Sequence, residues 1–311
     1  MKNSKQLIMI TAAALLLTTT SCGSDNEPAS GNPTNQVGIG NLTVAGQTST
    51  RAGEGAETLQ PFYAGDVLKA EYFASNGTDG VIGHYTHTAQ GTWTPQADVL
   101  STGEVPADGR YSLTKEADAL PNQSTWQQYH NADRIGGSVT FDSTTGQLYT
   151  DAGQQLDHLN ADLVIKITPD TDPNQWSTSE FEQYIRSARI AIHSLKDNGN
   201  DTYVLGGEDY TPWLAQVDAT GVTLRLHIHP CLVMFEGEAL ISITPADGSS
   251  TIVGRYSLDA GQTFNREENI TNQRLTISFS NYKKSLTHIF GQATIAPWED
   301  GGTVEIEGHQ D

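Results

Sequence analysis

The chain has 311 residues, with 17 Lys and Arg against 37 Asp and Glu, so its formal net charge is -20. A charge of this sign and size disfavours binding to nucleic acid and to anionic membrane surfaces, because their phosphates would repel the chain. We therefore expect no nucleic-acid partner.

The amino terminus has the pattern of a lipoprotein signal peptide. Lys2 and Lys5 precede an apolar run at 7–17 that is too short to span a bilayer, and small residues lead to Cys22. We predict a signal peptide at 1–21 and a lipid on Cys22, with the precursor delivered to the outer membrane. The alternative is a plain secreted protein that is cleaved just before Cys22.

The stretch that follows the signal peptide is polar and rich in small residues. Residues 22–36 cannot form a core, so they predict a flexible tether. Lipidation of Cys22 would leave Cys231 without an intramolecular partner, because the chain has two cysteines. Disulfides are therefore not expected to hold the fold.

From residue 37 onward, short apolar or alternating runs are separated by Gly, Asn, Asp and Pro. This pattern is typical of antiparallel β-sandwiches, so we predict an all-β fold. Strands are expected at 39–44, 67–73, 80–85, 138–141, 163–168, 189–195, 202–205, 222–228, 240–244, 275–280 and 292–295.

One segment departs from the strand pattern. Ser179 and Glu182 have the spacing of a capping box, and apolar residues then recur at helical intervals, so a short helix is expected there. About 270 residues after the leader suggest two domains. The glycine pair at 206–207 predicts a boundary between domains at 37–207 and 208–311.

His227, His229 and Cys231 occupy alternate positions, so one face of a strand could carry three zinc ligands. Pro230 interrupts the strand and no spacing indicates a fourth ligand. An ordinary strand with a free thiol is therefore the favoured interpretation, and we expect no metal and no cofactor. No nucleophile elbow or phosphate-binding loop is present, so we expect no enzymatic activity and no catalytic residues.

Short motifs with a common resemblance are spread over most of residues 37–308. In chain order they are Thr50-Arg51-Ala52, Pro61 to Asp66, Leu156 to Leu163, Gly254-Arg255-Tyr256, Leu258 to Gln262, Leu275-Thr276-Ile277 and Ile295 to Gly301. Together with the lipoprotein leader, they resemble the Bacteroidales fimbrillins, the subunits of type V pili. The resemblance implies two transthyretin-like β-sandwich domains in tandem and assembly by strand exchange into an adhesive surface fimbria.

The resemblance also implies proteolytic processing between Arg51 and Ala52 by an Arg-specific protease. Cleavage there would remove 37–44, an apolar-rich segment able to fill a strand position in the first sheet. Its loss would expose unpaired backbone groups, which a strand from another subunit could satisfy. The expected partners are other copies of this chain and related pilins, and the mature protein is expected in a cell-surface fimbrium.

The carboxyl-terminal tail at 292–306 is the predicted donor strand, because apolar and polar residues alternate along it. Its candidate anchoring side chains are Ile295, Trp298, Val304 and Ile306.

Two other functions stay open from the sequence. One is a lipid-anchored protein that binds glycans or host ligands, or a pilus anchor or tip subunit, and the other is a hydrolase whose carboxylates the sequence does not mark. An amino terminus at Ala52 would favour polymerisation, whereas a lipidated Cys22 as the only terminus would favour an anchored protein.

Overall fold

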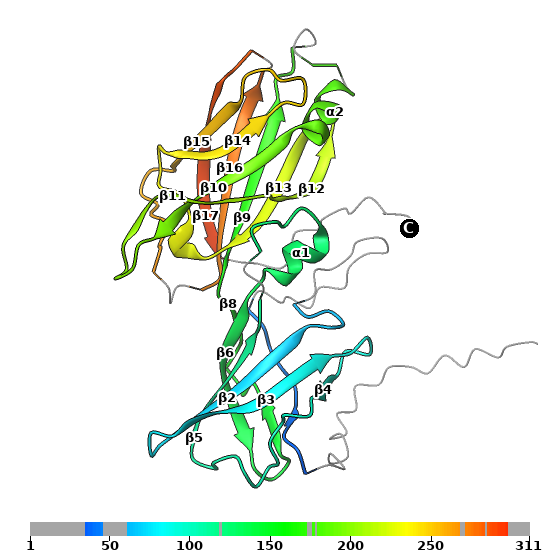
Figure 1. Cartoon of the computed structure of the whole chain (residues 1–311), viewed down its shortest axis with the longest axis vertical. Helices are drawn as coiled ribbons and strands as arrows, with labels where there is room; N and C mark the ends of the chain where they lie inside the picture. Colours follow the sequence, from blue (N-terminus) through cyan, green and yellow to red (C-terminus); the bar gives the residue numbers. More distant parts are fainter. Residues whose placement is uncertain are drawn as a thin grey trace, which may run out of the picture. The chain divides into compact units, whose positions relative to one another are not determined.

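The computed structural model describes residues 35–45, 61–117, 120–172, 176–177, 179–267, 271–283 and 285–297. Their strands form two sheets (Figure 1). The first contains, in spatial order, β1 (Gly38–Ile39), β7 (Gln147–Tyr149), β6 (Ile135–Asp142), β5 (Gly109–Lys115), β2 (Val67–Ala74), β3 (Asp79–His87) and β4 (Trp93–Pro95), with β8 (Asp157–His158) paired to β6. The second contains β11 (Tyr203–Tyr210), β10 (Arg189–Asp197), β14 (Ala239–Thr244), β15 (Ile252–Leu258), β17 (His288–Pro297), β16 (Gln273–Tyr282), β9 (Ala161–Pro169), β13 (Gly221–Ile228) and β12 (Trp213–Asp218).

The first sheet forms because its strands alternate between buried and exposed side chains. In β5, Tyr111, Leu113 and Lys115 are buried, while the residues between them are partly exposed. The core side chains of this sheet come from all its long strands and include Leu68, Ile82, Tyr85, Leu113, Ile135 and Leu148. The sheet therefore has its own hydrophobic core.

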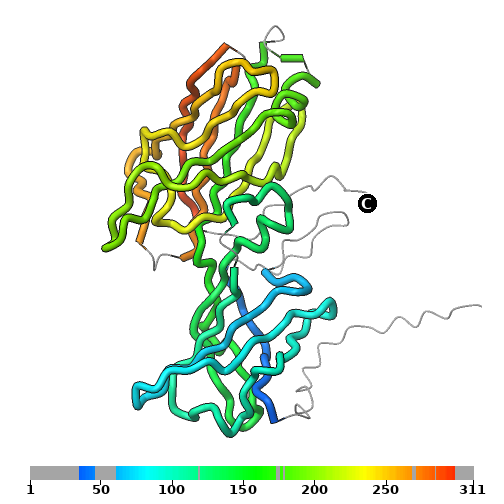
Figure 2. Tube along the Cα trace, viewed as in Figure 1, coloured from blue at the N-terminus to red at the C-terminus, as the bar shows by residue number. Residues whose placement is uncertain are grey.

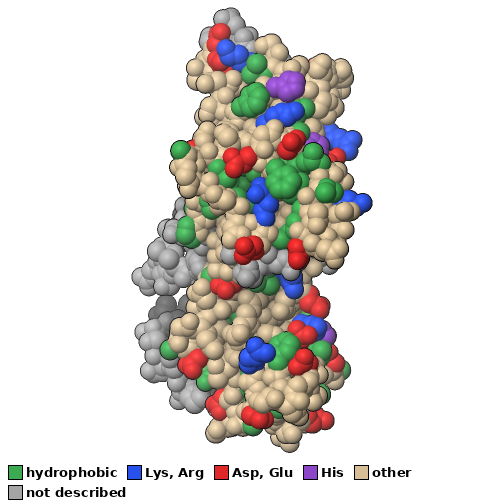
Figure 3. Space-filling model, turned by 90° about the vertical axis from the view of Figure 1, so that its left-hand side faces the viewer, with side chains coloured by type: hydrophobic (Ala, Val, Ile, Leu, Met, Phe, Trp, Pro, Cys, Tyr) green, Lys and Arg blue, Asp and Glu red, His purple; other side chains and the backbone are tan. Residues whose placement is uncertain are grey.

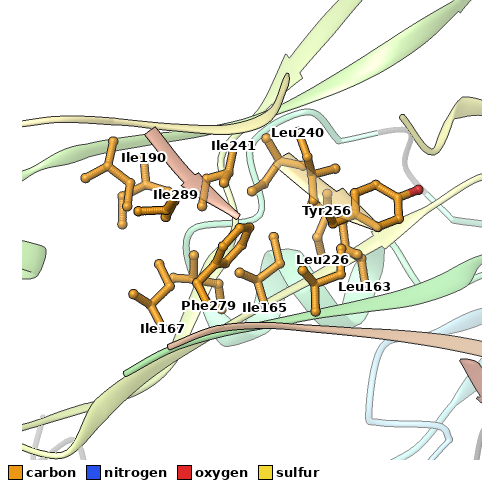
Figure 4. Packing of buried hydrophobic residues seen from close by; sticks show 14 of the residues in the cluster. Leu163, Ile165, Ile167, Ile190, Leu226, Leu240, Ile241, Tyr256, Phe279 and Ile289 are labelled. Atoms are coloured by element: carbon orange, nitrogen blue, oxygen red, sulfur yellow. The ribbon is translucent and has the colours of Figure 1, made fainter. Parts of the chain in front are cut away.

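The second sheet also has its own core, which Figure 4 shows from close by. Side chains from β9, β10, β13, β14, β15, β16 and β17 point toward one another there. Phe279 lies in the middle, and it has room because Gly291 has no side chain: a Cβ at Gly291 would lie 2.8 Å from the Phe279 ring. Glycine on β17 is thus part of how the core packs.

The chain passes from the first sheet to the second between His158 and Ala161. β8 pairs with β6 in the first sheet, whereas β9 pairs with β13 and β16 in the second. The sequence placed the domain boundary near residues 206–207, but strands β9 and β10 already belong to the second sheet.

The glycine pair at 206–207 lies inside β11, an edge strand of the second sheet. The register between β10 and β11 shifts beside this pair, and a Cβ at Gly207 would lie 2.3 Å from the Leu195 carbonyl oxygen. The two glycines therefore allow a bulge in a strand, where the backbones approach closely, and do not mark a linker.

The expected helix is present as α2 (Glu180–Ser187), which buries Phe181 and Ile185. Its predicted capping box does not form, because the Ser179 side chain makes no capping hydrogen bond. A second helix, α1 (Trp126–Asn131), was not predicted, and it does carry a capping box, between Thr125 and Gln128. A single 3-10 turn, η1, covers Pro230–Leu232.

The predicted fold class, an all-β chain with two sandwich domains and a short helix, is confirmed, with α1 as an addition. Within the described ranges, no helix has the length and apolar character needed to cross a bilayer.

Candidate functional site: the amino-terminal segment in the first sheet

Residues Gln36–Ala45, here called the amino-terminal segment, lie along the edge of the first sheet (blue in Figure 2). The Gly38 N–H donates to the Gly146 carbonyl at 2.8 Å, and the Gly40 N–H donates to the Leu148 carbonyl at 2.8 Å. The segment is therefore added to β7 as a parallel strand at β1.

Both ends of the segment are also held by backbone hydrogen bonds. At its start, the Val37 N–H donates to the Leu100 carbonyl at 3.0 Å. At its end, the Leu156 N–H donates to the Thr43 carbonyl and the Ala45 N–H donates to the Leu156 carbonyl, each at 2.8 Å. The segment thus satisfies polar groups of the sheet that would otherwise face water or an apolar groove.

Two valines fix the segment in the core of the first sheet. Val37 is 0% exposed and Val44 is 2% exposed, and both belong to the hydrophobic cluster of that sheet. The hydroxyl of Tyr85, whose pKa is raised by burial, donates to the Val37 carbonyl at 3.1 Å. Removal of the segment would expose two apolar sites and leave the Tyr85 hydroxyl without this acceptor.

A cavity of about 360 Å³ lies beside the middle of the segment. On one side it is lined by residues of the segment, among them Leu42, and on the other by Phe62, His87 and Trp93. The Phe62 and Trp93 rings meet edge to face at 5.1 Å, and the His87 and Trp93 rings lie 4.7 Å apart. The segment therefore fills its groove incompletely.

Most of the predicted processing and donor residues lie outside the described residues. These are Cys22, Arg51, Ala52, Trp298, Val304 and Ile306. The described chain stops at Ala45 and resumes at Pro61, so the predicted cleavage site lies between the amino-terminal segment and the rest of the first sheet.

Ile295 is placed within the second sheet. It lies in β17, opposite Leu275 of β16, and its N–H donates to the Gln262 side-chain oxygen at 3.0 Å. Ala293 on the same strand is 0% exposed, and β17 lies between β15 and β16. The first part of the predicted donor strand, up to Pro297, is thus a central strand of its own domain and is not free to enter another subunit.

The three possible zinc ligands lie in different surroundings. The His227 ring stacks on Tyr129 at 4.1 Å, and burial lowers its pKa to about 4. The Cys231 N–H donates to His229 Nδ1 at 3.4 Å, and the Cys231 thiol donates to the Arg266 carbonyl at 2.6 Å. Among the described residues, no three His, Cys, Asp or Glu side chains are grouped as metal ligands.

A buried ionic cluster around Asp162 was not predicted from the sequence. Arg225 and Arg274 donate to its carboxylate, the latter at 2.7 Å, and the Tyr129 hydroxyl donates to it at 3.0 Å. Burial by itself would raise the pKa of Asp162, but the two guanidinium groups outweigh burial and hold that pKa well below its usual range. The sequence feature that could have indicated this cluster is Arg225, a charged residue inside an otherwise apolar strand.

A second buried cluster joins α1 to the first sheet. His130 Nε2 lies 2.9 Å from an Asp66 carboxylate oxygen and 3.0 Å from Lys115 Nζ. Lys115 Nζ also donates to the His130 carbonyl at 3.1 Å. Every member is paired, so the cluster stabilises the junction of β2, β5 and α1 and offers no free nucleophile.

The surface drawn in Figure 3 has acidic and basic side chains interspersed, and its basic side chains form no continuous patch. With the net charge of -20, this face does not favour a polyanion.

No family model and no curated protein sequence matches the chain. A candidate cell adhesion protein from Bacteroides fragilis NCTC 9343 has a similar structure, with a TM-score of 0.44 and 9% identity over 84% of this chain and 95% of that one. One from Parabacteroides distasonis ATCC 8503 has a TM-score of 0.40 and 12% identity over 85% and 97%. The fimbrial anchor protein Mfa2 from Porphyromonas gingivalis has a TM-score of 0.33 and 10% identity over 75% and 89%. These likenesses are loose.

Proposed function

We propose that the chain is a structural subunit of a surface fimbria that assembles by strand exchange. The observation that carries this proposal is the amino-terminal segment, which fills a strand position in the first sheet and precedes Arg51 along the chain. A strand that is held at its own sheet edge and followed by a protease-sensitive residue can be released without cutting the sheet itself.

Cleavage after Arg51 leaves the segment held only by its hydrogen bonds and by the burial of Val37 and Val44. Once it leaves, the Leu156 N–H and the carbonyls of Gly146 and Leu148 lose their partners. A strand from another subunit restores these bonds by β-augmentation.

The donor is the chain that follows Pro297, with Trp298, Val304 and Ile306 as anchoring side chains; Ile295 is excluded by its place in β17. An acceptor groove in the first sheet and a donor at the other end of the chain make a heterologous contact, which extends as an open filament. The precursor carries its lipid on Cys22 and reaches the outer membrane before cleavage. The compared structures bear adhesion and fimbrial names, which agree with this role.

A reversible tether tests the proposal directly. Gly38 lies opposite Gln147 in the pairing of β1 with β7, so a Gly38→Cys, Gln147→Cys pair is placed to form a disulfide between the segment and β7. After treatment with an Arg-specific protease, the oxidised variant is expected to stay monomeric, and the reduced variant to form heat-sensitive, detergent-resistant ladders. The Gly38→Cys single variant is the control and should form ladders under both conditions. Ladders from the oxidised double variant would refute release of the segment.

A further inference from the structure

We propose that the cavity beside Leu42 is a receiving site for a bulky apolar side chain, ideally an aromatic ring, carried by the incoming donor strand. The chain's own segment leaves this site unfilled. The inference rests on the proposed strand exchange and adds to it the side chain by which an acceptor selects its donor.

The cavity has the size and the walls for an aromatic ring. Its volume is about 360 Å³ and it is open to solvent, so an aromatic side chain has both room and access. The rings of Phe62, His87 and Trp93 form one wall, and rings of this kind favour edge-to-face contact with another aromatic side chain. The cavity is continuous with the groove in which the segment lies, so a strand in that groove can reach it.

The sequence of the segment explains why the cavity is unfilled. Gly40 has no side chain to offer, and a Cβ at Gly40 would lie 3.0 Å from Gln147 Oε1 and 3.3 Å from Tyr149 Cβ. A larger residue there would press on β7 and not fill the cavity. Leu42 lines the cavity and is only partly buried against the core cluster of the first sheet. The position of Leu42 is therefore where a larger side chain gains contacts.

A strand that fills the cavity binds more tightly than the segment, although both make the same backbone hydrogen bonds. Additional burial of about 50 Å² of apolar surface corresponds to about a tenfold change in an equilibrium constant. Exchange of the segment for such a donor is then favourable, because the number of backbone bonds is conserved while apolar burial increases. The segment therefore fills the strand position only until exchange and leaves the cavity beside Leu42 unfilled.

The cavity can be tested in the intact chain without any exchange step. Leu42→Trp places an indole in the cavity. Thr43→Trp adds the same ring at an exposed neighbour that does not line the cavity. We expect Leu42→Trp to raise the folding equilibrium constant about tenfold in urea unfolding, with no gain for Thr43→Trp. If the indole prevents folding, the smaller variant Leu42→Phe is measured in its place and is expected to be more stable than wild type. Equal stability of the Leu42 and Thr43 variants would overturn the proposal.

A second measurement separates this inference from strand exchange itself. After cleavage by an Arg-specific protease, we expect Leu42→Trp to assemble at least tenfold more slowly than wild type, because its segment fills the cavity and is released less readily. Thr43→Trp should assemble at the wild-type rate. A stabilised Leu42→Trp in a chain whose wild type never assembles would refute the proposed function and leave the cavity assignment standing. Normal assembly without stabilisation would refute the cavity assignment alone.

Discussion

Buried ionisable residues dominate the chemistry of this chain at the residue scale. The buried Asp162 carboxylate is paired with both Arg225 and Arg274, and Tyr129 adds a hydroxyl donor. Removing Asp162 would take the shared acceptor from both guanidinium groups, so we expect its replacement to lower stability more than the loss of either arginine. The sequence pattern marked His227 as a possible metal ligand. It gave no sign that Tyr129 of α1 stacks on this ring.

His227 makes stability depend on pH in a definite window. Its pKa is lowered to about 4 by burial, against about 6.5 in an unfolded chain, so the fold holds the ring neutral. The contribution is fully present above pH 6.5 and is lost as the pH falls from 6.5 to 4, by about 3 kcal/mol. Urea unfolding between pH 7.5 and 4.5 measures it.

His227→Gln should flatten the pH dependence in that window, because the unfolded chain no longer takes up this proton. Asp133 and Asp162 act in a separate, more acidic window, because their pKa values lie below 3.8 in the fold. An unchanged slope in His227→Gln would show that this ring is not held neutral.

At the element scale, many strand positions were predicted, but β5, β12 and β15 were missed, and strand roles were not predictable. Short apolar runs identified β9 and β13, parts of which are buried on both faces, and alternation of apolar and polar residues identified β16, which has one buried face. The same alternation occurs in a free donor and in a central strand, so it could not show that Ile295 pairs within its own domain. Helix α1 was missed because six residues are too few for an apolar period, although Thr125 and Gln128 have the spacing of a capping box.

Two truncations separate the roles of the carboxyl-terminal residues. Deleting 298–311 leaves β17 whole, so the protein should fold and accept a donor strand but provide none, and it should shorten filaments when mixed with intact subunits. Deleting 292–311 removes every residue of β17 that pairs with β16 and should unfold the second sheet. Circular dichroism and thermal melting report folding, and electron microscopy reports filament length. Filaments of normal length from the 298–311 deletion alone would contradict the donor assignment.

At the scale of the whole molecule, the proposed assembly takes its acceptor edge from the first sheet and its donor from the chain that follows the second sheet. The amino-terminal segment completes the first sheet, and β17 leads out of the second toward the carboxyl terminus. In the proposed assembly, a chain with one acceptor and one donor would add subunits in one direction. Its net charge of -20 would oppose nonspecific association of unassembled subunits. The resemblance predicted an acceptor strand position and a donor tail from the sequence. The boundary between the sheets could be placed only from the pairing of β9, because the glycine pair inside β11 looks like a linker in the sequence.

The composition of the assembled filament tests the central claim most directly. Filaments purified after assembly should contain the chain from Ala52 onward and lack the peptide 36–45, as quantified by mass spectrometry against labelled standards. In the same filaments the Leu156 amide, which the segment protects in the precursor, should still resist hydrogen exchange because a donor strand has replaced Thr43 as its acceptor. Filaments that retain the peptide 36–45 in equal amount to the rest of the chain would contradict strand exchange.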